Sequence, residues 1–328
     1  MDIRIITEER ELNQLSAMAA KSRFSLGRVC PEEECPVRTC FQRDRDRVIH
    51  SKAFRRLMYK TQAFIYPEGD HFRTRLTHTL EVSQIARTIS RALQLNEDLT
   101  EAIALGHDLG HTPFGHIGEH DLNRVVLGGF RHNEQSVRIV ERLKKNGRGL
   151  NLTAEVRDGI LNHRGAGKPM TAEGKVVQLS DKIAYVNHDI DDALRTGKLK
   201  EEDLPKDCTA LLGHKVTARI DFLVKDVIKT SLEEGKIKMS SAAKEALYEL
   251  RGFMFKNIYT NPEVVSEHKS FETYLSRIYF YYDENFGSFP QDYLHIYGEN
   301  ELKERIICDY IAGMTDRFVV KLYEKLRL

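Results

Sequence analysis

The sequence predicts an all-α protein, a helical bundle followed by an additional C-terminal helical region. Apolar residues recur at three- and four-residue steps in segment after segment, which is the spacing of an amphipathic helix. Strand-like alternation does not persist for long, and the chain has no internal repeat or low-complexity segment. Because 328 residues exceed the usual size of one small domain, we expect one large domain or two joined ones.

The first clear helix is predicted from about Leu76. Its apolar side chains form one stripe, which consists of Val82, Ile85, Ala86, Ile89 and Leu93. Asn96 is a suitable cap for the next helix, because its side-chain oxygen can accept a hydrogen bond from a free backbone N–H. This second helix ends near His107 and Asp108. Gly110, Pro113 and Gly115 then break the pattern, so we expect residues 111–116 on a loop or tight turn.

The rest of the chain is also predicted to be helical. Helices begin at about Asn133 and about Thr153, residues 163–174 form a loop, and residues 177–194 form a long helix. This long helix carries a polar stripe that consists of Asp181, Tyr185, Asp189 and Asp192. Helical patterning continues from about Glu201, through the aromatic stretch RIYFYYDENF.

Composition excludes several classes of protein. No apolar run reaches the length of about 18 residues that a membrane span needs, so no membrane partner is expected. The charged start MDIRIITEERELNQ lacks the apolar run of a signal peptide, and we expect a cytoplasmic protein. Cys30, Cys35 and Cys40 stand at five-residue steps that match no common metal signature, and reduced thiols are expected.

The chain as a whole is nearly neutral, but one segment is basic. The net charge of +1 gives no global field towards a polyanion. Residues 41–60, however, hold seven Lys and Arg against two Asp. Two interpretations stay open for this segment, a solvated helix face or the lining of a site for a phosphate-rich ligand.

Histidines gather in the stretch LGHDLGHTPFGHIGEH, which contains His107, His111, His116 and His120. Buried histidines need partners, and the same stretch holds Asp108 and Glu119, so it indicates a metal with an acid–base site. His78 upstream and Asp181 downstream would complete a set of two imidazoles and two carboxylates. Such a set suits a divalent metal and leaves coordination positions open, although each residue alone is more often structural.

The order of His78, His107–Asp108 and Asp181 matches the H…HD…D pattern of HD-domain metal-dependent phosphohydrolases. Longer segments resemble the bacterial dGTPase-like deoxynucleoside triphosphate triphosphohydrolases: RDRDRVIHSKAFRRLMYKTQAF, RTRLTHTLEV, HDLGHTPFGHIGEH, RHNEQSVRIVERL and SDKIAYVNHDIDD. The likeness covers about residues 41–195 and continues more weakly through GFMFKNIY.

This resemblance implies an HD-domain helical bundle in three parts. Residues 1–40 are expected to form an N-terminal extension and residues 41–200 the catalytic core. Residues 201–328 are expected to form a helical region that contributes to the pocket, to an oligomer interface, or to both. The family hydrolyses a dNTP, either dGTP or a broader set, to a deoxynucleoside and inorganic triphosphate by water attack at the α-phosphorus.

The resemblance also implies the catalytic roles. The implied metal ligands are His78, His107, Asp108 and Asp181, and the metal is left open among Mn, Mg, Fe, Co, Ni and Zn. His116 and Glu119 are the implied catalytic pair. A bound metal can lower the pKa of water from 15.7 towards about 7, and a general acid helps the poor 5′-oxygen leaving group to depart. Alternatively, Glu119 pairs with His120 or Arg124 on the surface.

The substrate contacts follow from the same resemblance. Cationic or hydrogen-bonding side chains expected to touch the phosphates are Arg75, His111, His132 and Lys182. Those expected at the sugar are Gln62, Tyr185 and Asp189. The alternative for the residues on the long helix is an ordinary amphipathic face.

Two other functions stay open. One is an HD phosphohydrolase acting on another nucleotide, although the chain has no GYP tripeptide of the cyclic-dinucleotide type. The other is a nucleic-acid-binding or nucleotide-sensing regulator on an HD scaffold, with single-stranded nucleic acid as a possible partner. By analogy with relatives we expect a homo-oligomer, commonly a hexamer. The sequence does not indicate the preferred base, the native metal or activation by a second dNTP.

Overall fold

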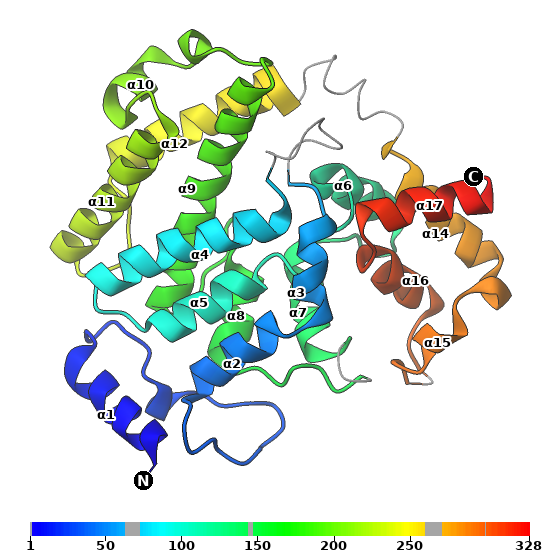
Figure 1. The fold of residues 1–328 in the computed structure, drawn as a ribbon, viewed down its shortest axis with the longest axis horizontal. Coiled ribbons are helices and arrows are strands. Elements are labelled where there is room, and N and C mark those ends of the chain that lie inside the picture. Colours follow the sequence, from blue (N-terminus) through cyan, green and yellow to red (C-terminus); the bar gives the residue numbers. More distant parts are fainter. Residues whose placement is uncertain (1, 63–72, 144–146, 260–270, 299) are drawn as a thin grey trace.

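The computed structural model describes residues 2–62, 73–143, 147–259, 271–298 and 300–328. The all-α prediction is confirmed: over these residues the chain forms helices and turns, and β-pairing is limited to two isolated bridges. Figure 1 shows the helices grouped around a central set, with the two ends of the chain far apart. All five cysteines are free thiols, as expected.

In the N-terminal and central parts of the chain, only α4 and α9 are long helices. The α-helices of these parts are α1 (Ile3–Gln14), α2 (Cys40–Ile49), α3 (Lys52–Arg56), α4 (Arg75–Ala92), α5 (Glu97–Gly106), α6 (Gly115–Val125), α7 (His132–Glu141), α8 (Ala154–Asn162) and α9 (Ala172–Arg195). The helices that follow are α10 (Lys206–Leu212), α11 (Val216–Glu234), α12 (Ser241–Met254), α14 (Tyr274–Glu284), α15 (Gln291–Leu294), α16 (Lys303–Ala312) and α17 (Asp316–Leu326).

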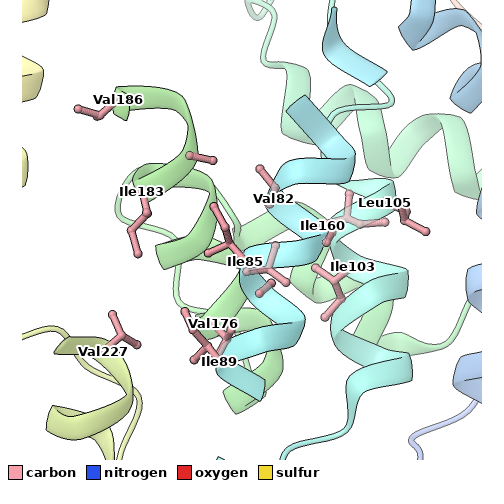
Figure 2. Packing of buried hydrophobic residues seen from close by; sticks show 14 of the residues in the cluster. Val82, Ile85, Ile89, Ile103, Leu105, Ile160, Val176, Ile183, Val186 and Val227 are labelled. Carbon is pink, nitrogen blue, oxygen red and sulfur yellow. The ribbon is translucent and has the colours of Figure 1, made fainter. Parts of the chain in front are cut away.

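The core that positions the site is formed by α4, α5, α8 and α9. The predicted stripe of α4 is buried, with Val82, Ile85 and Ile89 directed at the neighbouring helices (Figure 2). Ile103 of α5 and Ile160 of α8 meet the same cluster. Since burying an aliphatic side chain stabilises the fold by about 1.5–3 kcal/mol, this packing fixes how the four helices lie.

Side-chain caps explain several of the helix starts. The Asn96 side chain accepts a hydrogen bond from the backbone N–H of Leu99 at 3.1 Å, as the sequence predicts. The prediction was wrong at two helix starts. Helix α9 begins before residue 177, because the Thr171 side chain caps it by accepting from the N–H of Gly174.

The second difference concerns His116, which lies in the first turn of α6 and not on a loop. Phe114 and Gly115 both have positive φ, 59° and 55°, and this turn starts the helix. A side chain at Gly115 would also collide with the backbone, because its Cβ would lie 2.9 Å from the carbonyl oxygen of Gln62. The glycine that reads as a helix breaker is therefore the residue that lets α6 begin.

The C-terminal region divides between two buried clusters. Helices α11 and α12 pack on α9, α10 packs on α11 and α12, and all three share the first cluster, which extends to Ile258. Helices α14, α16 and α17 pack with α6 around a second, aromatic-rich cluster that begins at Phe114. Figure 1 shows these two groups on opposite sides of the central helices. The predicted divisions at residues 40 and 200 stay predictions.

A search for membrane-spanning helices found none: in the described part of the chain no helix combines the length and the apolarity that crossing a bilayer requires.

Candidate active site

Three helices bring the four predicted metal ligands together. His78 lies in the first turn of α4, His107 and Asp108 directly follow α5, and Asp181 lies on α9. Nε2 of His78 is 3.2 Å from Oδ1 of Asp181. Nε2 of His107 is 3.6 Å from Oδ1 of Asp108 and 3.8 Å from Oδ1 of Asp181. Two imidazole nitrogens and two carboxylates therefore face one small volume.

The orientation of the His107 ring suits a cation. Nδ1 of His107 is 2.6 Å from the carbonyl oxygen of Ala104, so it carries the hydrogen and leaves the Nε2 lone pair free. This buried Nε2 has no hydrogen-bond partner among the described residues. Burial would raise the pKa of Asp181, but its hydrogen bond with His78 and the nearby His107 ring hold that pKa below its ordinary value. The donor set fits a divalent metal ion.

Arg75 forms an ion pair with Asp108, one of the predicted metal ligands. Its guanidinium is buried, and Nη1 donates to Oδ2 of Asp108 at 2.7 Å. Burial would raise the pKa of Asp108, while the charges of His107 and Arg75 lower it well below its ordinary value. Asp108 is therefore ionised, and Arg75 supplies a positive charge beside it.

A second group of side chains lies next to Asp108. Ring nitrogens of His111 and His132 lie within 4.8 Å of one another and of an Asp108 oxygen. The two rings stack with centroids 4.3 Å apart and planes at 17°. Burial and the charge of Arg75 lower the pKa of His111 well below its ordinary value, so this imidazole is neutral.

Glu119 is the centre of this second group. Its carboxylate accepts from Nδ1 of His132 at 3.0 and 3.1 Å, and from Nη1 of Arg164 at 2.6 Å. His116, the predicted partner, has its Nδ1 at 3.7 Å and a side chain that is 70% exposed. Burial would raise the pKa of Glu119, but the adjacent His116 and His132 hold it well below its ordinary value. Glu119 thus sits between a buried and an exposed histidine.

Two site residues were missed in the sequence. His163 directly follows α8, and its Nε2 lies 3.3 Å from Nε2 of His132. Burial, together with the charges of His107 and His132, lowers the pKa of His163 to about 3. Arg164 pairs with Glu119 as described above. The available signal was a basic His-Arg pair directly after a helix, a position like that of His107 after α5.

The predicted substrate residues are less closely grouped. Gln62 is buried, and its backbone carbonyl oxygen accepts from Nη2 of Arg75 at 3.4 Å. Asp189 is buried and Tyr185 half-buried on α9, beyond Asp181. Lys182 lies with Nζ 3.4 Å from the Tyr248 hydroxyl of α12. That these four residues bind the sugar and the phosphates of one substrate stays a prediction.

The basic segment lies around a separate cavity of ≈ 770 Å³. Its basic lining residues are Arg38, Arg43, Arg47, Lys52, Arg56 and Lys60, and its acidic ones are Asp46, Asp292 and Asp309. Several of these cations are already paired, as in the 2.7 Å contact of Arg38 with Asp46. The lining residues from the described chain do not include the predicted metal ligands.

The fold and the site define a class. The HD domain family matches residues 75–186, and the family described as a phosphohydrolase-associated domain matches residues 237–325. The protein is an HD-domain phosphohydrolase.

Curated relatives narrow the class to a family. A deoxyguanosinetriphosphate triphosphohydrolase-like protein of Caldanaerobacter subterraneus subsp. tengcongensis is 57% identical, over 100% of this chain and 96% of its own length. One from Clostridium perfringens is 51% identical, over 99% and 98%. The chain belongs to the family of deoxyguanosinetriphosphate triphosphohydrolase-like proteins.

Proposed function

We propose that the protein hydrolyses dNTPs, dGTP or a broader set, to deoxynucleoside and inorganic triphosphate. The observation that carries the proposal is the convergence of His78, His107, Asp108 and Asp181 beside a buried Glu119–histidine group. The names of the relatives, deoxyguanosinetriphosphate triphosphohydrolase-like proteins, agree with this activity. We expect the reaction to occur in the cytoplasm.

His78, His107, Asp108 and Asp181 would hold the ion. A divalent ion there, Mn, Mg, Fe, Co, Ni or Zn, supplies charge stabilisation and lowers the pKa of water towards about 7. Arg75 keeps Asp108 ionised and in place through their 2.7 Å contact. His107 presents Nε2, because the carbonyl oxygen of Ala104 holds a hydrogen on Nδ1.

The proton for the leaving 5′-oxygen would come from His116. Its exposed imidazole stands in the first turn of α6, where a substrate can reach it. Glu119 lies 3.7 Å from His116 Nδ1 and can orient this imidazole. His111, His132, Arg75 and Lys182 are proposed to contact the phosphates.

The sugar is proposed to lie along α9. Tyr185 would pack against the deoxyribose ring, while Asp189 and Gln62 would bind its 3′-hydroxyl. Tyr185 and Asp189 follow Asp181 at four-residue steps, so one helix face leads from the metal to the sugar.

Product analysis tests this function. The protein is loaded with Mn²⁺ or Mg²⁺ and incubated with each dNTP in turn, and products are identified by ³¹P NMR and chromatography. We expect deoxynucleoside and intact triphosphate in equal amounts. Release of orthophosphate or pyrophosphate as the first product would refute the proposal, and the four rates give the base preference.

A second candidate function is binding of single-stranded nucleic acid at the basic cavity. The six Lys and Arg that line it against three Asp favour an anionic ligand there. The affinity for a short oligonucleotide should fall steeply with salt if phosphates are bound, because counterions are released. Binding that is weak and independent of salt would exclude this candidate.

We also propose that the protein is a homo-oligomer, a hexamer by analogy with relatives. Light scattering coupled to gel filtration measures the mass of the assembly in solution. If the measured mass is that of one chain at every protein concentration tested, the proposed homo-oligomer is excluded.

A further inference from the structure

A group of cationic side chains lies around Tyr248 of α12, where this helix packs on α9 (Figure 1). Nζ of Lys182 is 3.4 Å from the Tyr248 hydroxyl, and Nζ of Lys244 is 5.9 Å from the centre of the Tyr248 ring. The group, called the cation cluster below, consists of Lys175 and Lys182 of α9 and Lys244 and Arg251 of α12. Only Lys182 has a role in the reaction proposed above.

The cation cluster lacks carboxylates. On α11, exposed lysines pair with carboxylates one turn away, as Lys225 pairs with Asp221 at 2.7 Å. No member of the cation cluster has an Asp or Glu three or four residues away along the chain. Among the described residues none of its members forms an ion pair, and Lys175 donates instead to the amide oxygen of Gln178 at 2.6 Å. The described part of the chain therefore leaves this positive charge without a counter-charge.

The members of the cation cluster are close enough to act on one another. Burial and the charges of Lys182 and Lys244 lower the pKa of Lys175 below its ordinary value. Burial would raise the pKa of Tyr248, but the neighbouring cations, Lys182 foremost, lower it. A bound anion would relieve this repulsion, because it adds the opposite charge where like charges lie together.

The order of residues along α9 places the cluster relative to the proposed substrate. The proposed sugar contacts, Tyr185 and Asp189, follow Asp181 along the helix. Lys175 precedes Asp181 by six residues, which is about 9 Å along the helix axis. The charge of Lys244 acts on Lys175, so the start of α12 lies at this same end. Phosphates that extend from the metal ligands away from the sugar would therefore approach Lys175 and Lys244.

We propose that Lys175 and Lys244 form a subsite for the terminal phosphates of a nucleoside triphosphate. Lys182, which follows Asp181 directly and contacts Tyr248, joins this subsite to the metal ligands. Ammonium groups bind phosphates as point charges, so the subsite selects triphosphates over diphosphates and monophosphates. The proposal rests on the proposed function, because it assigns a position to the phosphates of the same dNTP.

Binding of inorganic phosphates of increasing length tests this subsite without turnover. Full-length protein in excess Mg²⁺ is titrated by calorimetry with the magnesium complexes of triphosphate, pyrophosphate and orthophosphate. We expect triphosphate to bind most tightly. Lys175→Gln and Lys244→Gln should each weaken triphosphate binding by about 10-fold, because each removes a charge-assisted contact, and should bind orthophosphate as the natural protein does. Lys229→Gln, which removes an exposed lysine paired with Glu233, should bind all three ligands unchanged.

Three results would overturn the proposal. They are unchanged triphosphate affinity in both variants, equal weakening of all three ligands, and equal affinity of the natural protein for the three phosphates. Lys244 is exposed, so its replacement is compatible with folding, and Lys244→Glu should weaken triphosphate binding further than Lys244→Gln. Release of pyrophosphate from a dNTP would refute the proposed function without changing these affinities, so the two failures are distinguishable.

Discussion

At the scale of the residue, Glu119 connects the histidines that lie next to the predicted metal ligands. The sequence predicts its pairing with His116, three residues earlier on the same helix. The structure adds His132 of α7 and Arg164 of the segment after α8, and these two make the shorter contacts. These could not be predicted from spacing, because His132 and Arg164 lie 13 and 45 residues away from Glu119 along the chain.

His116→Ala should lower kcat while the metal content stays the same. Loss of a general acid commonly lowers the rate by about 10²–10⁴-fold, and we expect a fall in this range for dNTP hydrolysis. Steady-state kinetics and elemental analysis measure the two quantities. His120→Ala on the same helix is the matched control and should retain natural activity. Loss of bound metal in His116→Ala would show that this residue is a ligand and not the acid.

At the scale of the element, buried stripes were predictable and contacts between helices were not. The stripe of α4 is visible because burial repeats along one face of a helix. The sequence of α8 gives no sign that Gly159 touches α5, since that contact depends on how two separate helices cross. A Cβ at Gly159 would lie 2.5 Å from Cδ1 and 2.8 Å from Cγ2 of Ile103.

Gly159→Ala should therefore destabilise the protein. Overpacking a buried contact costs about 1–3 kcal/mol, more than the roughly 1 kcal/mol that alanine gains over glycine in a helix. Gly252→Ala in α12 is the control, because its Cβ would meet no atom within 4 Å and should stabilise. Urea unfolding measures both changes. If Gly159→Ala were as stable as Gly252→Ala, the close approach of α5 and α8 would be contradicted.

Glu173 makes stability depend on pH. It lies fully buried in the first turn of α9 and accepts from the backbone N–H groups of Ala20 and Asn96. Burial raises its pKa from 4.5 to about 7. Because the folded state then binds this proton more tightly than the unfolded state, its contribution to stability is fully present below pH 4.5 and is lost as the pH rises through 7.

Glu173→Gln should remove this dependence. We expect the natural protein to lose stability relative to the variant between pH 4.5 and about 7, by on the order of 1–3 kcal/mol. Urea unfolding of both proteins at a series of pH values gives the difference. A difference that does not change over this range, or that changes in the opposite direction, would contradict the shifted pKa.

At the scale of the whole molecule, the C-terminal helices support the site. Asp316, the first residue of α17, accepts from the backbone N–H of Thr61 at 2.9 Å and from that of Phe114 at 3.0 Å. These residues adjoin Gln62 and the start of α6. The sequence predicts that residues 201–328 are helical, but periodicity does not tell which partner a helix packs against. The division between α10–α12 and α14–α17 was therefore not predictable.

Asp316→Ala should lower both stability and activity. Hydrogen bonds to a charged group contribute about 1.5–3 kcal/mol each, and we expect a loss of about 2–4 kcal/mol in the free energy of unfolding. The rate should fall as well, because the segments that carry Gln62 and His116 lose a common anchor. Asp221→Ala, which breaks only the exposed pair with Lys225, should change either quantity little. Full activity in Asp316→Ala would contradict the claim that the C-terminal helices support the site.

The central claim is that water attacks the α-phosphorus and breaks its bond to the 5′-oxygen. The three phosphates are then released together as inorganic triphosphate. Hydrolysis of the preferred dNTP in H₂¹⁸O, followed by mass spectrometry of both products, tests it most directly. We predict one ¹⁸O in the inorganic triphosphate and none in the deoxynucleoside. Label in the deoxynucleoside, or label in orthophosphate or pyrophosphate released in place of triphosphate, would contradict the account.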